Sequence, residues 1–130
     1  MGAPAAGAVV LVRFPFSDLS RTKLRPAIVL ADAGRGDAVL CQVTSKSYGD
    51  DRAVVITIED MASGSLDVTS FARPGKIFTA NESLVSSTVG NLKPEALTRV
   101  ADAIIELLRP KIAQNLETHT ETPATDPPEN

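Results

Sequence analysis

The spacing of apolar residues changes once along this chain, near residue 93. Before that point, apolar residues come in short runs separated by polar or glycine-containing stretches, which is typical of β-strands joined by turns. After it, apolar residues recur every three or four positions, which is the spacing of one face of an α-helix. The pattern therefore predicts a mainly β protein, a small barrel or strongly twisted sheet, followed by a C-terminal helix.

The strands and their connections can be placed approximately. The sequence predicts strands over residues 8–16, 26–33, 38–44, 52–58 and 66–72, with extended pieces at 76–80 and 87–92. The expected connections are loops at 17–25 and 45–51, turns at 34–37 and at Gly64, a break at 73–76 and a helical turn at 81–84. The segment 26–33 begins with consecutive apolar residues, which favours a strand buried on both faces.

The helix is predicted over residues 94–109. Pro94 suits the first helical position and Pro110 is expected to end the helix. Its apolar face comprises Leu97, Val100, Ala101, Ile104 and Leu108. Ile105 and Leu107 lie beside this face and widen it. The wide face could contact a partner subunit, or the helix could sink deeply into its own domain.

Composition divides the chain near residue 110. A length of 130 residues suggests one domain. Residues 1–110 contain 12 Lys or Arg and 12 Asp or Glu, so the net charge of −3 comes from residues 111–130. That last segment is rich in Pro, Thr and acids and poor in apolar residues, so we expect a folded domain over 1–110 and a disordered acidic tail over 111–130.

Cysteine content and the N-terminus bear on location. The single cysteine, Cys41, cannot form an intrachain disulfide, which fits a reducing compartment. The N-terminal apolar run is too short for a signal peptide or a membrane span. We therefore expect a cytoplasmic protein without membrane contact. Residues 1–49 carry 6 cations against 3 anions, so this half is locally basic, which leaves a nucleic-acid partner possible.

Several kinds of chemistry are excluded by residue type. The only histidine, His119, lies in the predicted tail. A catalytic pair of two histidines is therefore impossible, and a Ser-His-Asp or Cys-His arrangement is not expected. One Cys and one His far apart provide no His/Cys metal site. The acidic pairs at 50–51 and 59–60 are interpreted as solvated turns rather than Mg²⁺ ligands. The chain has no phosphate-binding glycine loop of the P-loop type. We expect no cofactor and no metal.

Arg, Lys, Ser and Thr remain, and they suit a phosphodiester. Arg presents a planar set of donors that matches phosphate oxygens. In RNA the 2′-hydroxyl can attack the adjacent phosphorus, so a protein need only orient it and stabilise the developing charge. Arg25 precedes Pro26, which favours an extended backbone and a fixed starting point for the side chain. A solvated loop cation is the alternative interpretation of Arg25.

Three stretches carry a resemblance to a known family. They are "VVLVRFPFSDLSRTKLRPAIVL", "AVLCQVTSK" and "SFARPGKIFT", followed by an amphipathic helix. Over residues 7–108 the chain resembles the PemK/MazF toxins of type II toxin–antitoxin systems. The resemblance implies an SH3-like, CcdB/MazF-like β-barrel that forms a homodimer. It also implies metal-independent endoribonuclease cleavage of single-stranded RNA (an mRNA interferase) and neutralisation by a cognate antitoxin protein.

The resemblance also implies roles for single residues. Arg25 matches the catalytic Arg, which stabilises the cleaved phosphate, and Thr44 matches the hydroxyl residue opposite it. A strand-end capping role is the alternative for Thr44. We expect RNA to bind through Arg21, Lys23, Ser45, Lys46, Tyr48, Arg73 and Lys76. Within this set, Tyr48 is the candidate for base stacking and Arg73 could instead be a surface cation.

One departure from the family keeps other functions open. Some members have an Asp two residues after the position of Arg73, whereas this chain has Gly75. The missing carboxylate puts an Arg–Asp acid/base pair in doubt. A non-catalytic barrel that binds RNA, DNA or a protein, and a topoisomerase poison on the same barrel, are therefore the alternatives to the nuclease.

Overall fold

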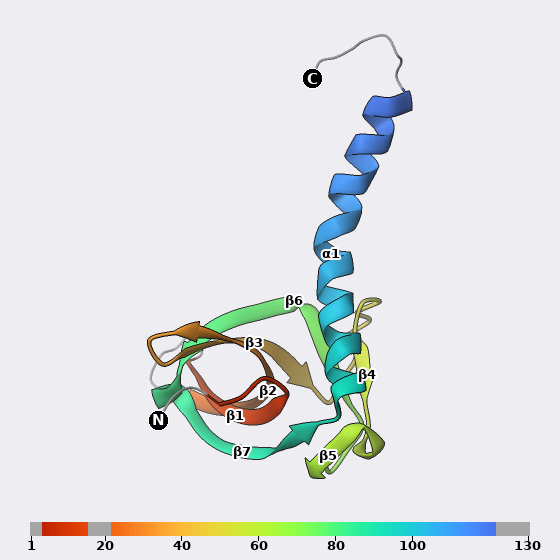
Figure 1. Cartoon of the computed structure of the whole chain (residues 1–130). Helices are drawn as coiled ribbons and strands as arrows, with labels where there is room; N and C mark the ends of the chain where they lie inside the picture. The colour runs from red at the N-terminus through yellow and green to blue at the C-terminus, as the bar shows by residue number, and fades with distance from the viewer. Residues whose placement is uncertain (1–3, 16–21, 122–130) are drawn as a thin grey trace.

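The computed structural model describes the backbone of residues 4–15 and 22–121, and the side chains of 4–13 and 23–109. Figure 1 shows a curved sheet with one long helix leaving it. The strands are β1 (Ala8–Pro15), β2 (Thr22–Gly34), β3 (Asp37–Thr44), β4 (Val54–Ile56), β5 (Met61–Gly64), β6 (Ser70–Asn81) and β7 (Val85–Leu92). The helical elements are the 3₁₀ turns η1 (Ile58–Asp60) and η2 (Glu82–Leu84) and the helix α1 (Pro94–Glu121).

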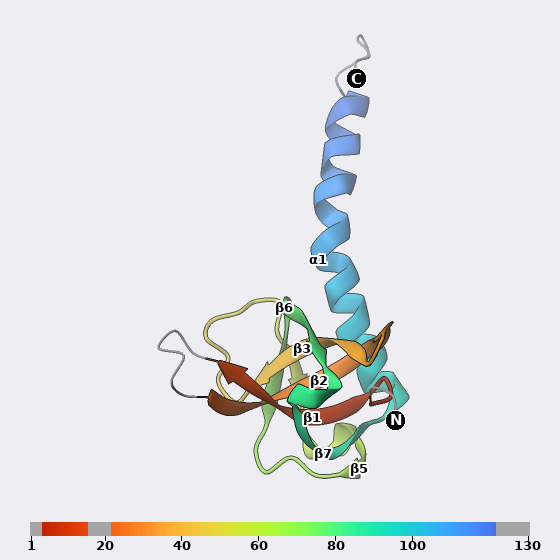
Figure 2. The same ribbon diagram turned by 90° about the vertical axis from the view of Figure 1, so that its left-hand side faces the viewer.

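All seven strands belong to one antiparallel sheet. Their order is β4-β6-β3-β2-β1-β7-β5. The two edge strands, β4 and β5, follow each other in the chain and are connected through η1. The sheet therefore curls into a half-barrel whose edges approach each other near the start of α1, as the two views agree (Figures 1 and 2). The mainly β fold with a C-terminal helix confirms the predicted fold class.

The strand β2 begins earlier than predicted. Thr22–Arg25 was expected to belong to a loop, but these residues pair with β1, Thr22 with Pro15 and Arg25 with Val12. Pairing in the ladder thus extends the strand through Arg25 and past Pro26. The backbone of Arg25 is held extended both by the following proline and by the neighbouring strand.

The break predicted at residues 73–76 is a bulge inside one strand. In the pairing of β3 with β6, Cys41 lies opposite Ile77 and Val43 opposite Ala72. The four residues Arg73–Lys76 therefore lie opposite Gln42 alone. A bulge accommodates Pro74, which cannot donate to a ladder, and turns the neighbouring side chains outward.

The prediction is wrong over residues 52–72. The strand expected at 52–58 spans only Val54–Ile56, the turn expected at Gly64 is the end of β5, and the strand expected from residue 66 begins at Ser70. The cause is local capping. Asp60 accepts a hydrogen bond from the Thr57 backbone N–H at 2.8 Å, which turns the chain into η1 and ends the short strand.

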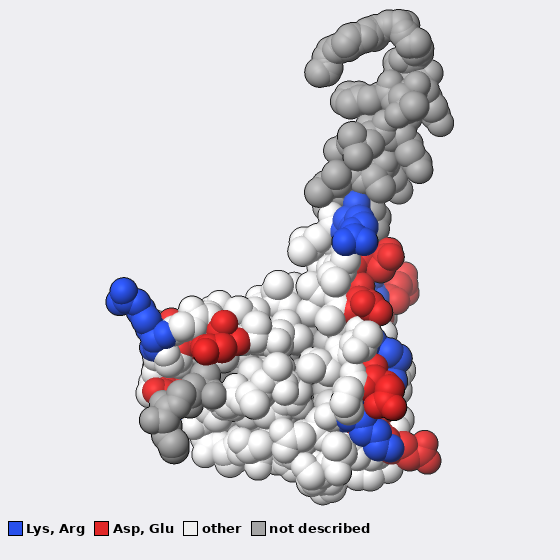
Figure 3. Space-filling model, in the orientation of Figure 1, with Lys and Arg blue, Asp and Glu red and all other residues white. Residues whose placement is uncertain are grey.

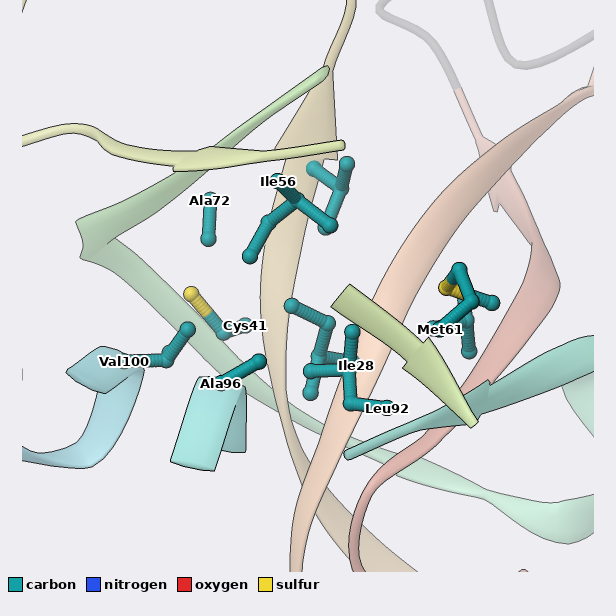
Figure 4. Packing of buried hydrophobic residues seen from close by; sticks show 10 residues of the cluster. Ile28, Cys41, Ile56, Met61, Ala72, Leu92, Ala96 and Val100 are labelled. Atoms are coloured by element: carbon teal, nitrogen blue, oxygen red, sulfur yellow. The ribbon is translucent and has the colours of Figure 1, made fainter. Parts of the chain in front are cut away.

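Two apolar clusters lie on the two sides of the sheet. The first packs under α1 and includes Ile28, Cys41, Ile56, Ala96 and Val100 (Figure 4). The second includes Val10, Val12, Val29, Leu40 and Ala80. Neighbouring residues of β2, Ile28 and Val29, belong to different clusters and both are fully buried. The prediction that this strand is buried on both faces is confirmed.

The helix α1 covers the first cluster only with its first turns. Ala96 and Val100 are buried there, and Leu97 and Ile104 pack against the same cluster. Leu108 is 61% exposed and Ile105 is 43% exposed, so this part of the apolar face does not sink into the domain of its own chain. The later part of the helix extends away from the sheet, as both ribbon views show.

The predicted end of the helix at Pro110 is also wrong. The backbone stays helical to Glu121, and residues 122–130 lie outside the described residues. A proline removes one helical hydrogen bond and crowds the carbonyl four residues earlier, which weakens or kinks a helix without having to end it. The division of the chain into a domain over 1–110 and a tail stays a prediction. Within the described part of the chain, no helix is both long and apolar enough to cross a membrane.

Two glycines allow β5 to approach β7 closely. Gly64 pairs with Gly90. A Cβ on Gly64 would lie 2.1 Å from the Val89 carbonyl oxygen, and a Cβ on Gly90 would lie 2.4 Å from the Ser63 carbonyl oxygen. Gly64 also has a φ of +74°, which favours glycine. This contact fixes where the chain leaves β5.

We expect Gly64→Ala to lower the free energy of unfolding more than Gly34→Ala. Both positions have positive φ, but a Cβ on Gly34 would meet nothing within 4 Å. The backbone conformation alone accounts for about 1–2 kcal/mol at either site. The clash at Gly64 should add about 1–3 kcal/mol. Urea unfolding measures both variants, and equal losses would show that the close approach does not matter.

Candidate functional site

An open groove of about 820 Å³ lies at the end of the sheet where β2 begins and β3 ends. Its base comes from the strands, and its two walls come from the connection after β3 and the connection after β5. The lining residues are Leu11, Lys23, Leu24, Arg25, Pro26, Val43, Thr44, Ser45, Lys46, Tyr48, Ser65, Leu66, Asp67, Val68, Ser70 and Val89.

The structure brings Arg25 and Thr44 together in this groove. Arg25 stands near the first residue of β2 and Thr44 is the last residue of β3, and these two strands are antiparallel neighbours. Arg25 is half-buried, and Thr44 is only 9% exposed. The sequence predicted these two residues as the catalytic pair, and the fold places both on one surface.

The Thr44 hydroxyl also has a structural role. Its Oγ1 accepts a hydrogen bond from the Lys46 backbone N–H at 3.2 Å. The alternative interpretation of Thr44 as a strand-end cap is therefore observed. A hydroxyl that accepts one bond still has its own hydrogen to donate, so capping orients this group without using it up.

The charged lining of the groove is mainly cationic. Lys23, Arg25 and Lys46 line it, against one carboxylate, Asp67. Sequence pattern gave no reason to place Asp67 in the site, because it stands in a segment interpreted as a strand and nothing local relates it to Arg25. Arg21, a predicted RNA-binding residue, lies outside the described residues. Elsewhere, Lys and Arg alternate with Asp and Glu along the side where β4 and β5 lie below α1 (Figure 3).

The remaining predicted residues are distributed between two hollows. Ser45, Lys46 and Tyr48 stand on one wall of the groove. Arg73 and Lys76 line a second hollow of about 440 Å³, which Tyr48 also lines. The structure therefore does not bring Arg73 and Lys76 to Arg25, and Tyr48 alone lines both hollows among the predicted residues that the structure describes.

Arg73 has a carboxylate partner that the sequence did not reveal. Its Nε donates to Asp50 Oδ2 at 3.1 Å, and the two side chains are 22% and 17% exposed. The guanidinium carbon also lies 5.3 Å from the centre of the Tyr48 ring, within the range of a cation–π contact. The hydrogen bond from Arg73 holds the pKa of the Asp50 carboxyl below its usual range. Asp50 thus gives Arg73 a carboxylate partner, which Gly75 cannot provide.

Cys41 supports the bulge that carries Arg73. Its Sγ donates to the Arg73 carbonyl oxygen at 3.2 Å. Burial raises the pKa of the Cys41 thiol to about 11, so it stays protonated at neutral pH and is a poor nucleophile. In the described part of the chain, no three His, Cys, Asp or Glu side chains gather closely enough to hold a metal ion.

A family model matches most of the chain. The model of the family described as "PemK-like, MazF-like toxin of type II toxin-antitoxin system" matches residues 5–108. This span includes every predicted catalytic and RNA-binding residue. No curated protein sequence shows significant similarity to the chain.

Solved structures of the same fold are similar at low sequence identity. A MazE–MazF structure from Deinococcus radiodurans matches with a TM-score of 0.66 and 22% identity, over 82% of this chain and 97% of that one. An endoribonuclease in complex with its cognate antitoxin, from a mycobacterial species, matches with a TM-score of 0.63 and 17% identity, over 84% of this chain and 96% of that one. The Mycobacterium tuberculosis toxin MazF-mt6 matches with a TM-score of 0.62 and 15% identity, over 78% of this chain and 96% of that one. These matches confirm the fold.

The Asp50–Arg73 pair should make stability depend on pH in the acid range. Because the folded state lowers the pKa of Asp50 from 3.8, the pair stabilises the fold above that value, and this contribution is lost as the pH falls through the lowered pKa. We expect Asp50→Asn to reduce the free energy of unfolding at pH 7 by up to about 1 kcal/mol. Urea unfolding should show the difference from the wild type shrink as the pH falls below 3.8 and vanish below the lowered pKa.

A neighbouring carboxylate supplies the control for this measurement. Asp51→Asn removes an exposed carboxylate one residue along the same loop. The variant should unfold like the wild type at every pH. A difference that persists for Asp50→Asn in acid would mean that the carboxylate charge is not what stabilises the loop.

Proposed function

Because the chain belongs to the PemK-like, MazF-like toxins of type II toxin–antitoxin systems, we propose that it cleaves single-stranded RNA in the groove of Arg25 and Thr44. The observation that carries this proposal is the meeting of these two residues in one cationic groove. Endoribonuclease activity is also what the mycobacterial structure of the same fold is described as having. A growth-inhibiting effect through cleavage of messenger RNA follows from that activity.

The proposed reaction uses a nucleophile that belongs to the RNA. The 2′-oxygen attacks the adjacent phosphorus, a P–O2′ bond forms, and the P–O5′ bond breaks. The 2′-hydroxyl loses its proton and the leaving 5′-oxygen gains one, so the products end in a 2′,3′-cyclic phosphate and a 5′-hydroxyl. No external oxidant or water enters this step, and the protein has only to orient groups, move a proton and stabilise charge.

Three groove residues have matching abilities. The guanidinium of Arg25 is a planar cation and can donate two parallel hydrogen bonds to the phosphoryl oxygens as negative charge develops. The Thr44 hydroxyl, fixed by its bond to the Lys46 N–H, can donate to the same group. Asp67 is the carboxylate among the described lining residues and can accept the 2′-hydroxyl proton.

Binding of the RNA backbone is assigned to the cations and hydroxyls around this centre. Lys23, Ser45 and Lys46 line the groove. Phosphate contacts of this kind position single-stranded RNA without reading its sequence, and they weaken as salt concentration rises. Arg21 stays a predicted contact.

Two protein partners complete the proposal. Structures of the same fold are described as complexes with MazE or a cognate antitoxin, so a cognate antitoxin is the expected inhibitor of this chain. A second copy of the chain is the expected partner in a homodimer. Ile105 and Leu108 support an interface because they are exposed apolar residues three positions apart, on neighbouring parts of the α1 surface. The middle of the face shown in Figure 3 also lacks charged side chains, as interface centres often do.

Replacing both exposed helix residues with glutamate should weaken the dimer. We expect the wild type to be dimeric at micromolar concentration, and Ile105→Glu/Leu108→Glu to raise the dissociation constant at least about tenfold, because two charges would be buried on association. Light scattering after size-exclusion chromatography measures this. A monomeric wild type, or a double variant that stays fully dimeric with unchanged affinity, would exclude this surface as the interface.

Cleavage in the presence of EDTA tests the proposed reaction. Wild-type protein should cut a long single-stranded RNA at discrete sites, and a 2′-deoxy nucleotide at a cut site should abolish that cut. We expect Arg25→Ala to reduce kcat by about 100- to 1000-fold, the loss typical of removing one charge-stabilising donor. Thr44→Ala should also reduce kcat, and Arg25→Lys should restore little, because an ammonium cannot donate as a planar fork.

The control removes a cation from the opposite end of the same strand. Arg35 stands in the turn after β2 with a φ of 57°, which asparagine tolerates, so Arg35→Asn should leave cleavage unchanged. The variant Asp67→Asn distinguishes two roles for Asp67, acceptance of the proton and simple lining of the groove wall. The substitution should change the acid limb of the pH–rate profile only if Asp67 accepts the proton. Folded wild-type protein that binds varied RNAs without cutting them would overturn the nuclease and favour a binding module.

A further inference from the structure

Tyr48 stands between the two hollows. It lines the groove of Arg25 and Thr44, and it also lines the second hollow. Its side chain is 63% exposed, and Tyr48 has a φ of 53°. An aromatic residue rarely adopts this left-handed conformation, and it does so only where the surroundings hold it there. The backbone conformation at Tyr48 is therefore imposed by its neighbours.

Those neighbours form a small locked turn. The Asp50 N–H donates to the Ser47 carbonyl at 2.9 Å, and the Ala53 N–H donates to the Asp50 carbonyl at 3.1 Å. The other Asp50 carboxylate oxygen accepts from the Arg52 N–H at 3.0 Å. The backbone and the side chain of Asp50 thus both form hydrogen bonds within this loop.

Arg73 connects this turn to the sheet. Its Nε pairs with Asp50 at 3.1 Å, its guanidinium carbon lies 5.3 Å from the Tyr48 ring centre, and its carbonyl accepts from Cys41. The residue is therefore held at three points, and its guanidinium supports one side of an exposed ring. This arrangement is unlike that of a mobile surface cation that waits for a phosphate.

The second hollow has the features of a nucleotide subsite. Arg52 and Lys76 contribute cations that can meet a phosphate, and Leu107 of α1 contributes an apolar side chain. A rigid exposed aromatic ring beside cations is the usual platform for a base of single-stranded nucleic acid, because every base can stack on it. The groove that Tyr48 also lines is the proposed cleavage site.

We propose that the Asp50–Arg73 pair positions Tyr48 as a stacking platform for a base of single-stranded RNA that passes from the groove into the second hollow. The nucleotide beyond the ring places its phosphate near Arg52 and Lys76. This inference rests on the proposed function, since it assigns a flanking subsite to the same substrate. Arg73 is then a positioning residue, which acts on RNA through Tyr48.

The composition of the chain provides a direct probe. Tyr48 is the only tyrosine, and the chain has no tryptophan, so intrinsic tyrosine emission reports on this ring alone. A 2′-O-methyl RNA oligonucleotide has no free 2′-hydroxyl and stays intact in the groove. We expect it to quench the emission with a saturating dependence on concentration. Binding is measured in parallel by anisotropy of a labelled oligonucleotide, which does not depend on the tyrosine.

The variants separate the ring from its support. Tyr48→Leu should weaken binding by about 5- to 150-fold, the range for loss of one stacked base, whereas Tyr48→Phe should retain it. Arg73→Gln keeps the tyrosine, but its quenching and affinity should fall toward the level of Tyr48→Leu, and the two changes together should add little further. Exchange of charges in Asp50→Arg/Arg73→Asp should restore part of the affinity.

A second ion pair supplies the matched control. Arg99 Nη2 pairs with Asp60 at 2.9 Å between α1 and η1, and neither residue lines the groove or the second hollow. Arg99→Gln should leave the quenching unchanged. Circular dichroism and thermal unfolding establish that every variant is folded.

The outcomes distinguish this inference from the proposed function. Binding without quenching, or quenching that survives Arg73→Gln unchanged, would overturn the positioning role even if the wild type cuts RNA. Failure to cut unmodified RNA, with quenching that depends on Arg73, would overturn the nuclease and leave the subsite standing. Cleavage with quenching lost in Arg73→Gln and kept in Arg99→Gln supports both.

Discussion

The burial of β2 on both faces is the constraint on which the rest of the structure depends. Ile28 and Val29 are adjacent, point to opposite sides of the sheet, and are both excluded from water. A sheet with such a central strand needs cover on each side. The first turns of α1 cover one side through Ala96 and Val100, and the curvature of the sheet around the second cluster covers the other. The half-barrel and the docking of the helix both follow from this requirement.

The same constraint leaves one end of the strands open and places chemistry there. Arg25 near the start of β2 and Thr44 at the end of β3 lie where the apolar clusters stop and the groove begins. The groove walls are connections and not strands, so contacts outside the strand ladder must hold them in place. The close approach of Gly64 and Gly90 fixes one wall, and the Asp50–Arg73 pair fixes the other. Rigid walls are what a site requires if it acts by orienting its substrate.

Prediction from the sequence succeeded where the cause of structure is local. The alternation and runs of apolar residues identified β1, β3, β7 and the start of α1, and the Arg25–Pro26 pair indicated an extended backbone. It was wrong where the Asp60 cap ends β4 early and where partners distant in sequence decide. The strand expected at 66–72 begins only where β3 and β4 offer pairing to Ser70–Ala72. The bulge at Arg73–Lys76 was predicted as a break between strands. The strand continues across the bulge because it pairs with β3, and the local sequence pattern contains no information about that pairing.

The sequence by itself determined the fold class, the family and the two residues at the centre of the candidate site, because each rests on residue type and short-range spacing. Only the tertiary structure decided which other groups share that site. It brought Asp67 into the groove and moved Arg73 and Lys76 into a second hollow. It also gave Arg73 a carboxylate from 23 residues away. Such contacts arise when a curved sheet brings separate connections to one end, and their geometry depends on pairing register and close packing that no single segment encodes.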